Sequence, residues 1–266
     1  MRLALLSDLH GNPIALDAVL ADIQANGGVD GYLVLGDLVA IGHDPVGVLE
    51  RLVALAGARF VQGNTDRYVV TGQRPYPSSS DAAVDTNLIP RLVEVANSFA
   101  WTQGVVTAGG WLDWLSALPL EERLELPDGS RLLATHIAPG QEDGGGIHPA
   151  LSDADLAALI GDAAAEVVCV GHTHWPLDRT ARGVRVINTG SVSNPSPPDL
   201  RASYAIVDAD ASGYAVQHAR VAYDAAAVIT AVERSRHPAG EYIISHFRGQ
   251  RHPWWQSNVG LHDPFG

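Results

Sequence analysis

Lysine is absent from this chain of 266 residues, and all 17 of its basic residues are arginines. This absence excludes the mechanisms that need a lysine amine, namely Schiff-base and pyridoxal chemistry and the Walker-type phosphate loop. Any contact to a phosphate group must come from arginine, backbone N–H groups, histidine or a metal ion. The formal net charge of −13 also makes nucleic acid an unlikely partner, because binding to its backbone needs clustered basic side chains.

Cysteine is almost absent as well. Cys169 is the single cysteine and lies inside an apolar segment, which excludes an intramolecular disulfide and predicts a small core residue. No apolar run approaches the roughly 20 residues of a membrane helix, and the sequence starts without the long apolar stretch of a signal peptide. We therefore expect a cytoplasmic protein with no membrane contact.

Five short apolar segments each run into polar residues of the types that bind metal ions. The segments and the polar residues after them are 2–7 with Asp8 and His10, 31–35 with Asp37, 59–62 with Asn64, 131–134 with His136, and 167–170 with His172 and His174. Short apolar runs of this kind are typical of buried strands. Ligands bind beyond the carboxyl ends of the strands in open α/β sheets, so we expect these side chains to meet at one site.

The most informative of these clusters is the pair His172 and His174. Two histidines separated by one residue on an extended segment point to the same side, so both can reach one pocket. Neutral imidazole is a common ligand of divalent transition metals. Nitrogen and oxygen ligands without sulfur favour Mn, Fe, Zn, Ni or Co over Mg or Ca.

Each candidate ligand taken alone also has a structural explanation. Asp8 and Asp37 could cap the helices that follow them, and Asn64 could form an Asx turn. His136 could be a hydrogen-bonded core histidine. Their joint occurrence at strand ends favours a metal site over these alternatives.

Helical spacing of apolar residues predicts helices over about 13–26 and 45–56, each directly after a strand. This alternation of strands and helices is typical of a parallel sheet. Further along the chain, the pattern predicts a helix over about 152–160, strands over 184–188, 203–208 and 214–223, a helix over 224–234, and no regular element after that. The last two of these strands are expected to pair antiparallel, which indicates a second sheet.

A long segment from about 67 to 125 interrupts this alternation. We expect it to form a mostly helical cap inserted into a single domain over 1–266, with a C-terminal extension from about 224. Three tryptophans of the cap are expected to pack it against the body of the domain; these are Trp101, Trp111 and Trp114. Alternatively one of them, or Tyr68 or Tyr76, stacks on a ring of the substrate.

The ordered set of motifs resembles the calcineurin-like metallophosphoesterase superfamily. The motifs are Asp8-Leu-His10-Gly-Asn12, Gly36-Asp37, Gly63-Asn64, His136 and Gly171-His172-Thr-His174, within residues 1 to about 195. The first of them, together with Gly36-Asp37-Leu-Val-Ala-Ile-Gly42 and Asn188-Thr-Gly-Ser-Val192, is most similar to the small bacterial phosphodiesterases of that superfamily. The resemblance implies an α/β (α+β) fold, a four-layer αββα sandwich of two mixed β-sheets flanked by helices.

The resemblance also implies two divalent transition-metal ions, with Mn favoured over Fe, Zn, Ni and Co. One metal would be held by Asp8, His10 and His174, the second by Asn64, His136 and His172, and Asp37 would bridge the two. A carboxylate suits the bridge because it offers two oxygens and one negative charge to two cations. Asp37, Asn64 and His136 are the residues expected to be catalytic.

One position departs from the pattern of the superfamily. Many members have a histidine after the asparagine ligand, which is thought to assist the leaving group or to contact the phosphate, and Thr65 stands there in this chain. The proton donor to the leaving group is therefore unassigned, with His148 and His43 as candidates by position. The expected contacts to the substrate are Asn12, Arg67 and His148.

We therefore expect a binuclear metal-dependent phosphodiesterase that hydrolyses a small-molecule or nucleotide phosphate ester by direct attack of a metal-bridging hydroxide. The alternative among enzymes is a phosphomonoesterase, including a dinucleotide polyphosphate or protein phosphatase, and the acidic charge disfavours a nuclease. The alternative from another class is a metal-binding scaffold without catalysis, because one fold can host unrelated functions. The sequence leaves the oligomeric state open.

Overall fold

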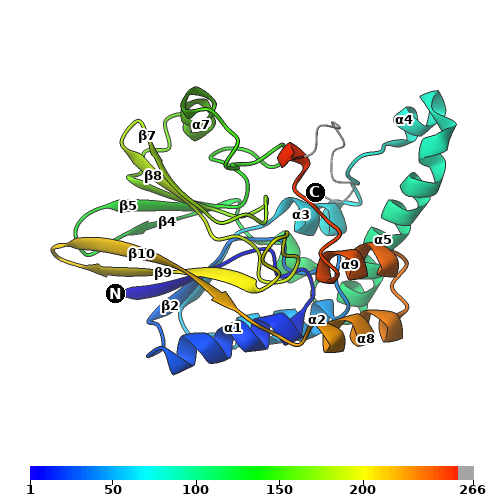
Figure 1. Cartoon of the computed structure of the whole chain (residues 1–266), viewed down its shortest axis with the longest axis horizontal. Coiled ribbons are helices and arrows are strands. Elements are labelled where there is room, and N and C mark those ends of the chain that lie inside the picture. Colours follow the sequence, from blue (N-terminus) through cyan, green and yellow to red (C-terminus); the bar gives the residue numbers. More distant parts are fainter. Residues whose placement is uncertain (257–266) are drawn as a thin grey trace.

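Two five-stranded mixed sheets packed face to face form the centre of the computed structural model, which describes residues 1–256 (Figure 1). The first sheet has the order β10 (Gly213–Val221), β9 (Ala202–Asp210), β1 (Arg2–Leu6), β2 (Gly31–Val34) and β3 (Ala58–Phe60). The second has the order β4 (Glu121–Glu125), β5 (Arg131–Thr135), β6 (Val167–Val170), β8 (Val184–Asn188) and β7 (Leu177–Ala181). In each sheet three adjacent strands are parallel, β1 to β3 in the first and β5, β6 and β8 in the second, so their carboxyl ends share an edge.

Alternating side chains give the sheets their inner and outer faces. In β1, Leu3 and Leu5 pack into the core between the two sheets. Ala4 and Leu6 point the other way and pack against helices. Cys169 of β6 lies in the inner core, where burial raises the pKa of its thiol to about 12. The thiol therefore stays protonated and acts as a small core residue, as predicted.

Helices cover the outer face of each sheet. The first sheet is covered by α1 (Pro13–Ala25) and α2 (Pro45–Val53), and α8 (Ala225–Ser235) continues this helical layer beyond the strand ends, as Figure 1 shows. The second is covered by α7 (Asp153–Ile160). The expected four-layer αββα sandwich is confirmed. Within residues 1–256 there is no helix whose length and hydropathy would allow it to cross a membrane.

Local sequence signals set the starts of these helices. Proline is the first residue of both α1 and α2, where its missing N–H costs no hydrogen bond. The residue before each proline is the cap: Asn12 accepts from the N–H of Ala15 at 3.2 Å, and Asp44 accepts from that of Gly47 at 2.9 Å. Ser152 caps α7 in the same way.

The predicted cap segment, about 67–125, lies mostly within four helices. These are α3 (Asn64–Thr71), α4 (Ser79–Val84), α5 (Ile89–Ala108) and α6 (Leu112–Ser116). The rings of Trp114 and Phe60 of β3 pack edge to face, with centroids 5.2 Å apart, so this tryptophan holds α6 against the first sheet. The helical part ends earlier than predicted, because β4 occupies 121–125.

Two edge strands, β4 and β7, lack the apolar pattern that predicts the other strands. Their sequences are Glu-Glu-Arg-Leu-Glu and Leu-Asp-Arg-Thr-Ala, and both lie at an edge of the second sheet. Charged side chains on edge strands oppose pairing with other chains. The polar composition that protects these edges also hides them from a prediction based on hydrophobic pattern.

The C-terminal extension predicted from about 224 contains α8, as expected, and a further helix, α9 (Gly240–Phe247). The sequence pattern does not predict α9, which is only eight residues long and buries the polar side chains of Ser245 and His246 along with its apolar ones. Buried polar residues in so short a segment obscure the apolar period that indicates a helix. The short helix η2 (Trp254–Gln256) follows, and the rest of the predicted extension, 257–266, lies outside the described residues.

A buried histidine joins the cap to the C-terminal extension and should make stability depend on pH. His237 packs against Trp101 of α5, with ring centroids 4.6 Å apart, and its Nδ1 accepts the N–H of Ala239 at 3.1 Å. Burial lowers the pKa of His237 to about 4. In the unfolded chain this histidine takes up a proton at about pH 6.5, whereas in the folded chain it does so only near pH 4. The free energy of unfolding therefore falls as the pH drops from about 6.5 to 4, by up to about 3 kcal/mol.

The matched variant is His237→Asn, whose side-chain oxygen can still accept the N–H of Ala239. We expect its free energy of unfolding, measured by urea denaturation, to fall less than that of the wild type over this pH interval. Parallel curves for the two proteins would show that His237 is not the titrating group.

Candidate metal centre

The loops that follow β1 and β2 are joined by backbone hydrogen bonds. The N–H of Asp8 donates to the oxygen of Gly36 at 3.0 Å, and that of His10 donates to the oxygen of Asp37 at 2.9 Å. Gly36 has a φ of 89°. A Cβ at this position would lie 2.6 Å from the nitrogen of Gly63 and 2.9 Å from Nδ1 of His136. Only glycine allows the loops to approach this closely.

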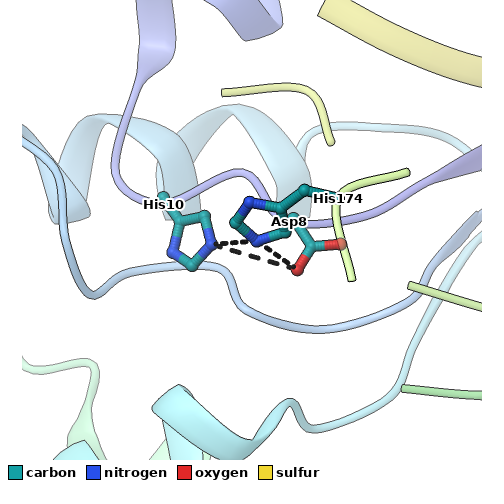
Figure 2. A group of neighbouring side chains, drawn as sticks. All are labelled: Asp8, His10 and His174. Carbon is teal, nitrogen blue, oxygen red and sulfur yellow. Dashed lines mark hydrogen bonds and ion pairs between the residues drawn. The ribbon is translucent and has the colours of Figure 1, made fainter. Parts of the chain in front are cut away.

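Asp8, His10 and His174 form the first of two side-chain groups (Figure 2). The Nε2 atoms of His10 and His174 are 3.1 Å apart, and Nε2 of His174 lies 3.2 Å from Oδ1 of Asp8. Asp8 and His10 are fully buried, and His174 is half-buried. The loop after β1 and the loop after β6 thus bring three ligand-type atoms within 4.8 Å of one another.

Asp37, Asn64, His136 and His172 form the second group beside the first. Oδ1 of Asn64 lies 3.0 Å from Nε2 of His136 and 3.0 Å from Nδ1 of His172. Oδ1 of Asp37 lies 3.4 Å from Nε2 of His136. The other oxygen of Asp37, Oδ2, is 3.9 Å from Nε2 of His10 in the first group. The carboxylate of Asp37 therefore stands between the two groups, with one oxygen toward each.

Backbone carbonyls fix the orientation of all four imidazole rings. The contacts are His10 Nδ1 to Ala40 O at 3.0 Å, His136 Nδ1 to Leu35 O at 2.6 Å, His172 Nε2 to Gly144 O at 2.9 Å and His174 Nδ1 to Asn194 O at 2.9 Å. A carbonyl oxygen only accepts, so each ring donates its N–H outward and, when neutral, presents a lone pair to the centre. Outward hydrogen bonds of this kind are typical of metal-ligating histidines.

The chemistry of the donor set fits divalent cations. The lone pairs of His10 and His174 face each other, and Oδ1 of Asp8 is buried without a hydrogen-bond partner in the described part of the chain. Burial alone would raise the pKa of Asp37, but His136, His10 and His172 hold it well below its usual range. Burial alone would lower the pKa of His136, and Asp37 instead raises it to about 9. Converging acceptors of this kind need protons or cations between them.

Five of the seven side chains of these groups sit on left-handed backbone. The residues are Asp8 with a φ of 56°, His10 with 44°, Asp37 with 55°, His172 with 69° and His174 with 56°. This conformation is uncommon for residues other than glycine and clusters at functional sites. The concentration of strain at these positions supports a functional role for them independently of side-chain chemistry.

Two positioning residues have no distinct signal in the sequence. Asp66 accepts the N–H of Leu38 at 2.9 Å and that of Gly63 at 3.1 Å, so it links the loops that carry Asp37 and Asn64. Asn188, at the end of β8, donates to the oxygen of Gly171 at 2.7 Å and fixes the loop of His172 and His174. Asn188 opens one of the motifs that carry the resemblance, but the partners of both residues become visible only in the fold.

A cavity of about 400 Å³ opens above both groups. Its floor includes His10, Asp37, His172 and His174, and its walls come from three other segments. The wall residues include Tyr68, Arg74 and Tyr76 from the cap, Asp143 and Gly144 from the loop before α7, and Tyr242, His246, Arg251, Trp254 and Trp255 from the C-terminal extension. Tyr68 and Tyr76 are thus placed where ring stacking on a substrate is feasible, whereas Trp101, Trp111 and Trp114 are not among the lining residues.

The structure places the three expected substrate contacts away from the cavity lining. Asn12 is buried, caps α1 and donates to Ser193 Oγ at 3.2 Å, so its polar atoms are engaged in the fold. Arg67 is neutralised by Asp143, 2.8 Å away. The His148 ring stacks on Trp255, with centroids 4.7 Å apart. His43, the other candidate proton donor, is also not among the lining residues.

Thr65 is fully buried and does not line the cavity. Its N–H donates to Oδ1 of Asp37 at 3.0 Å, so its backbone orients the central carboxylate. Position 65 therefore contributes to the site through its main chain and not through a side chain in the cavity wall.

Comparisons with known proteins agree with this geometry. Residues 1–212 match the sequence model of the calcineurin-like phosphoesterase superfamily domain. An uncharacterized protein of Methanocaldococcus jannaschii is 27% identical over 255 residues, which cover 89% of this chain and 93% of that protein. The crystal structure of a metallophosphoesterase from Sphaerobacter thermophilus is similar, with a TM-score of 0.72 and 26% identity, over 94% of this chain and 100% of that one. A hypothetical protein of Pyrococcus horikoshii shares the fold, with a TM-score of 0.78 and 21% identity, over 94% of this chain and 99% of that one.

Proposed function

Because the chain belongs to the calcineurin-like phosphoesterase superfamily, we propose that it is a metal-dependent phosphodiesterase that hydrolyses a small-molecule or nucleotide phosphate ester. The observation that supports this proposal most is the convergence of seven ligand-type side chains, with all four imidazole N–H groups turned outward, below one cavity. Two divalent cations at such a site lower the pKa of a water molecule, orient the phosphorus centre and neutralise its oxygens during in-line displacement.

The two side-chain groups define the proposed ligand sets. Asp8, His10 and His174 would hold one cation, and Asn64, His136 and His172 the other. Asp37 would bridge them, because its two oxygens face different groups. A nitrogen and oxygen set without sulfur suits manganese, iron, zinc, nickel or cobalt, and we favour manganese.

The cavity walls favour a diester over a monoester. Aromatic side chains line it from two separate segments, Tyr68 and Tyr76 in the cap and Tyr242 and Trp254 in the C-terminal extension. A diester has an organic group on each side of the phosphorus, so each wall can contact one of them. A volume of about 400 Å³ suits a small molecule or a mononucleotide rather than a folded nucleic acid.

The direct test compares hydrolysis of bis(4-nitrophenyl) phosphate with that of the monoester 4-nitrophenyl phosphate. Protein stripped of metal and reloaded with Mn²⁺ is expected to cleave the diester at least about tenfold faster than the monoester, because only the diester fills both walls. Elemental analysis of the reloaded protein should find two metal ions per chain. Protein kept in EDTA is the control and should be inactive.

Three other results would each contradict part of this proposal. Faster cleavage of the monoester would identify a phosphomonoesterase. Two bound metal ions without turnover of any phosphate ester would favour the alternative of a metal-binding scaffold without catalysis. Efficient cleavage of single-stranded DNA or RNA would identify the protein as a nuclease despite its acidic net charge.

A further inference from the structure

Two arginines line the cavity from different parts of the chain. Arg74 lies between α3 and α4, and Arg251 lies just after α9. Within residues 1–256 neither has a carboxylate oxygen within 4.0 Å. By contrast, Arg67 beside the cavity pairs with Asp143, and Arg248 lies 3.8 Å from a carboxylate oxygen of Glu241. The chain has 30 acidic and 17 basic residues, yet two of its arginines that line one cavity have no carboxylate partner within residues 1–256.

Arg251 is held in place but keeps donors available. Its Nε donates to Oγ of Ser245 at 2.6 Å, and its guanidinium lies 4.2 Å from the ring centroid of Tyr242. Stacking on an aromatic ring orients the planar guanidinium group without using its terminal N–H groups. Among the described residues 1–256 neither terminal nitrogen of Arg251 has a hydrogen-bond partner, so both can bind a ligand in the cavity.

Arg74 is anchored in a comparable way. Its Nη1 donates to the oxygen of Tyr68 at 3.0 Å and to that of Gln73 at 2.6 Å. Its Nη2 and Nε have no partner among the described residues. Burial lowers the pKa of Arg74, which reflects a charge already partly removed from water. A partly desolvated cation without a counter-charge gains more from an incoming anion than an exposed one does.

Within residues 1–256 neither arginine has a hydrogen bond or ion pair with the proposed metal ligands, four of which form the cavity floor where the phosphoryl group being hydrolysed must lie. A separate phosphate in the upper cavity has a double negative charge and three terminal oxygens, enough to accept from two guanidinium groups at once. We propose that Arg74 and Arg251 bind a second phosphate group of the substrate, distinct from the phosphodiester that is cleaved. This inference rests on the proposed function and narrows its substrates to phosphorylated diesters.

Two substrates that differ by one phosphate test this inference. They are the 4-nitrophenyl ester of thymidine 5′-phosphate and the same compound with an added 3′-phosphate, and both release 4-nitrophenolate. For the Mn²⁺-loaded wild type we expect kcat/KM to be at least about tenfold higher on the 3′-phosphorylated compound. Arg74→Gln and Arg251→Gln should each bring this ratio close to one, by raising KM on that compound alone.

Two further variants separate charge and structure. Arg248→Gln is the matched control, since Arg248 lies near Arg251 but outside the cavity lining, and it should keep the wild-type ratio. Arg251→Lys keeps the positive charge but lacks the planar guanidinium group. It should give a ratio of kcat/KM between those of the wild type and the glutamine variant. Melting temperatures of all variants show whether a lost preference reflects a loosened fold.

The outcomes distinguish this inference from the function on which it rests. Hydrolysis of neither compound would overturn both. Equal hydrolysis of the two by the wild type would overturn only the second phosphate site. A preference that survives both glutamine variants, or an equal loss on both compounds, would show that these arginines do not bind a second phosphate.

Discussion

Asp37→Asn is expected to lower kcat for bis(4-nitrophenyl) phosphate by about 10³-fold or more. The substitution keeps the shape of the side chain but removes the negative charge that stands between the two ligand groups. Two cations bound as proposed would repel each other across the neutral amide. The loss of several kcal/mol of charge stabilisation corresponds to several orders of magnitude in rate. Steady-state kinetics in Mn²⁺ measures the effect.

Elemental analysis of the same variant shows where the loss arises. Fewer than two metal ions per chain would show that the activity is lost through weaker metal binding. Two metal ions per chain would show that the chemical step itself is slower. Asp17→Asn is the control, because Asp17 is a surface carboxylate that pairs with Arg51 far from the site. Wild-type activity in Asp37→Asn would refute the proposed bridge.

Gly63→Ala is expected to empty the second ligand group and to destabilise the fold by about 3 kcal/mol or more. A Cβ at this position would lie 2.1 Å from Oδ1 of Asp37 and 2.3 Å from its backbone nitrogen. The backbone of Gly63 is extended, with a φ of −86°, so the cost is steric rather than conformational. Either Asp37 or the loop that carries Asn64 must move, and both are proposed metal ligands.

Gly104→Ala is the matched control for this substitution. Gly104 lies inside α5, and a Cβ there would meet no atom within 4 Å. Alanine in a helix interior should raise the free energy of unfolding by about 0.5–1 kcal/mol. Thermal denaturation and metal analysis of both variants are the measurements. A Gly63→Ala protein that keeps two metals and its melting temperature would show that the loops are more tolerant than their packing indicates.

The sequence predicted the floor of the site better than its walls. Asp8, Asp37 and His172 each follow an apolar strand, and parallel strands bring their carboxyl ends together, so local pattern and topology suffice to predict that they converge. The metal roles of these residues remain predictions. Their convergence below one cavity is a property of the structure.

The cavity walls could not be predicted because they depend on contacts between distant segments. Nothing near Arg67 in the sequence indicates that Asp143 neutralises it, and nothing near Arg251 indicates that it returns to the cavity. Asn12 follows a motif glycine and was expected at the substrate, yet its side chain caps α1 and bonds Ser193. The edge strand β7 and the helix α9 are hard to predict for a related reason. β7 is mostly polar, and the short helix α9 buries polar side chains that become partnered or covered only in the fold.

The left-handed backbone at five positions of the site has a consequence for the choice of ligand chemistry. Apart from glycine, aspartate, asparagine and histidine are the residue types most often found in that conformation. Among the seven ligand-type residues, the five with positive φ are all aspartate or histidine, such as Asp8, Asp37 and His174. At these five positions the sharp turns at the strand ends therefore favour residue types that are also common metal ligands. Backbone geometry and coordination chemistry thus favour the same side chains there.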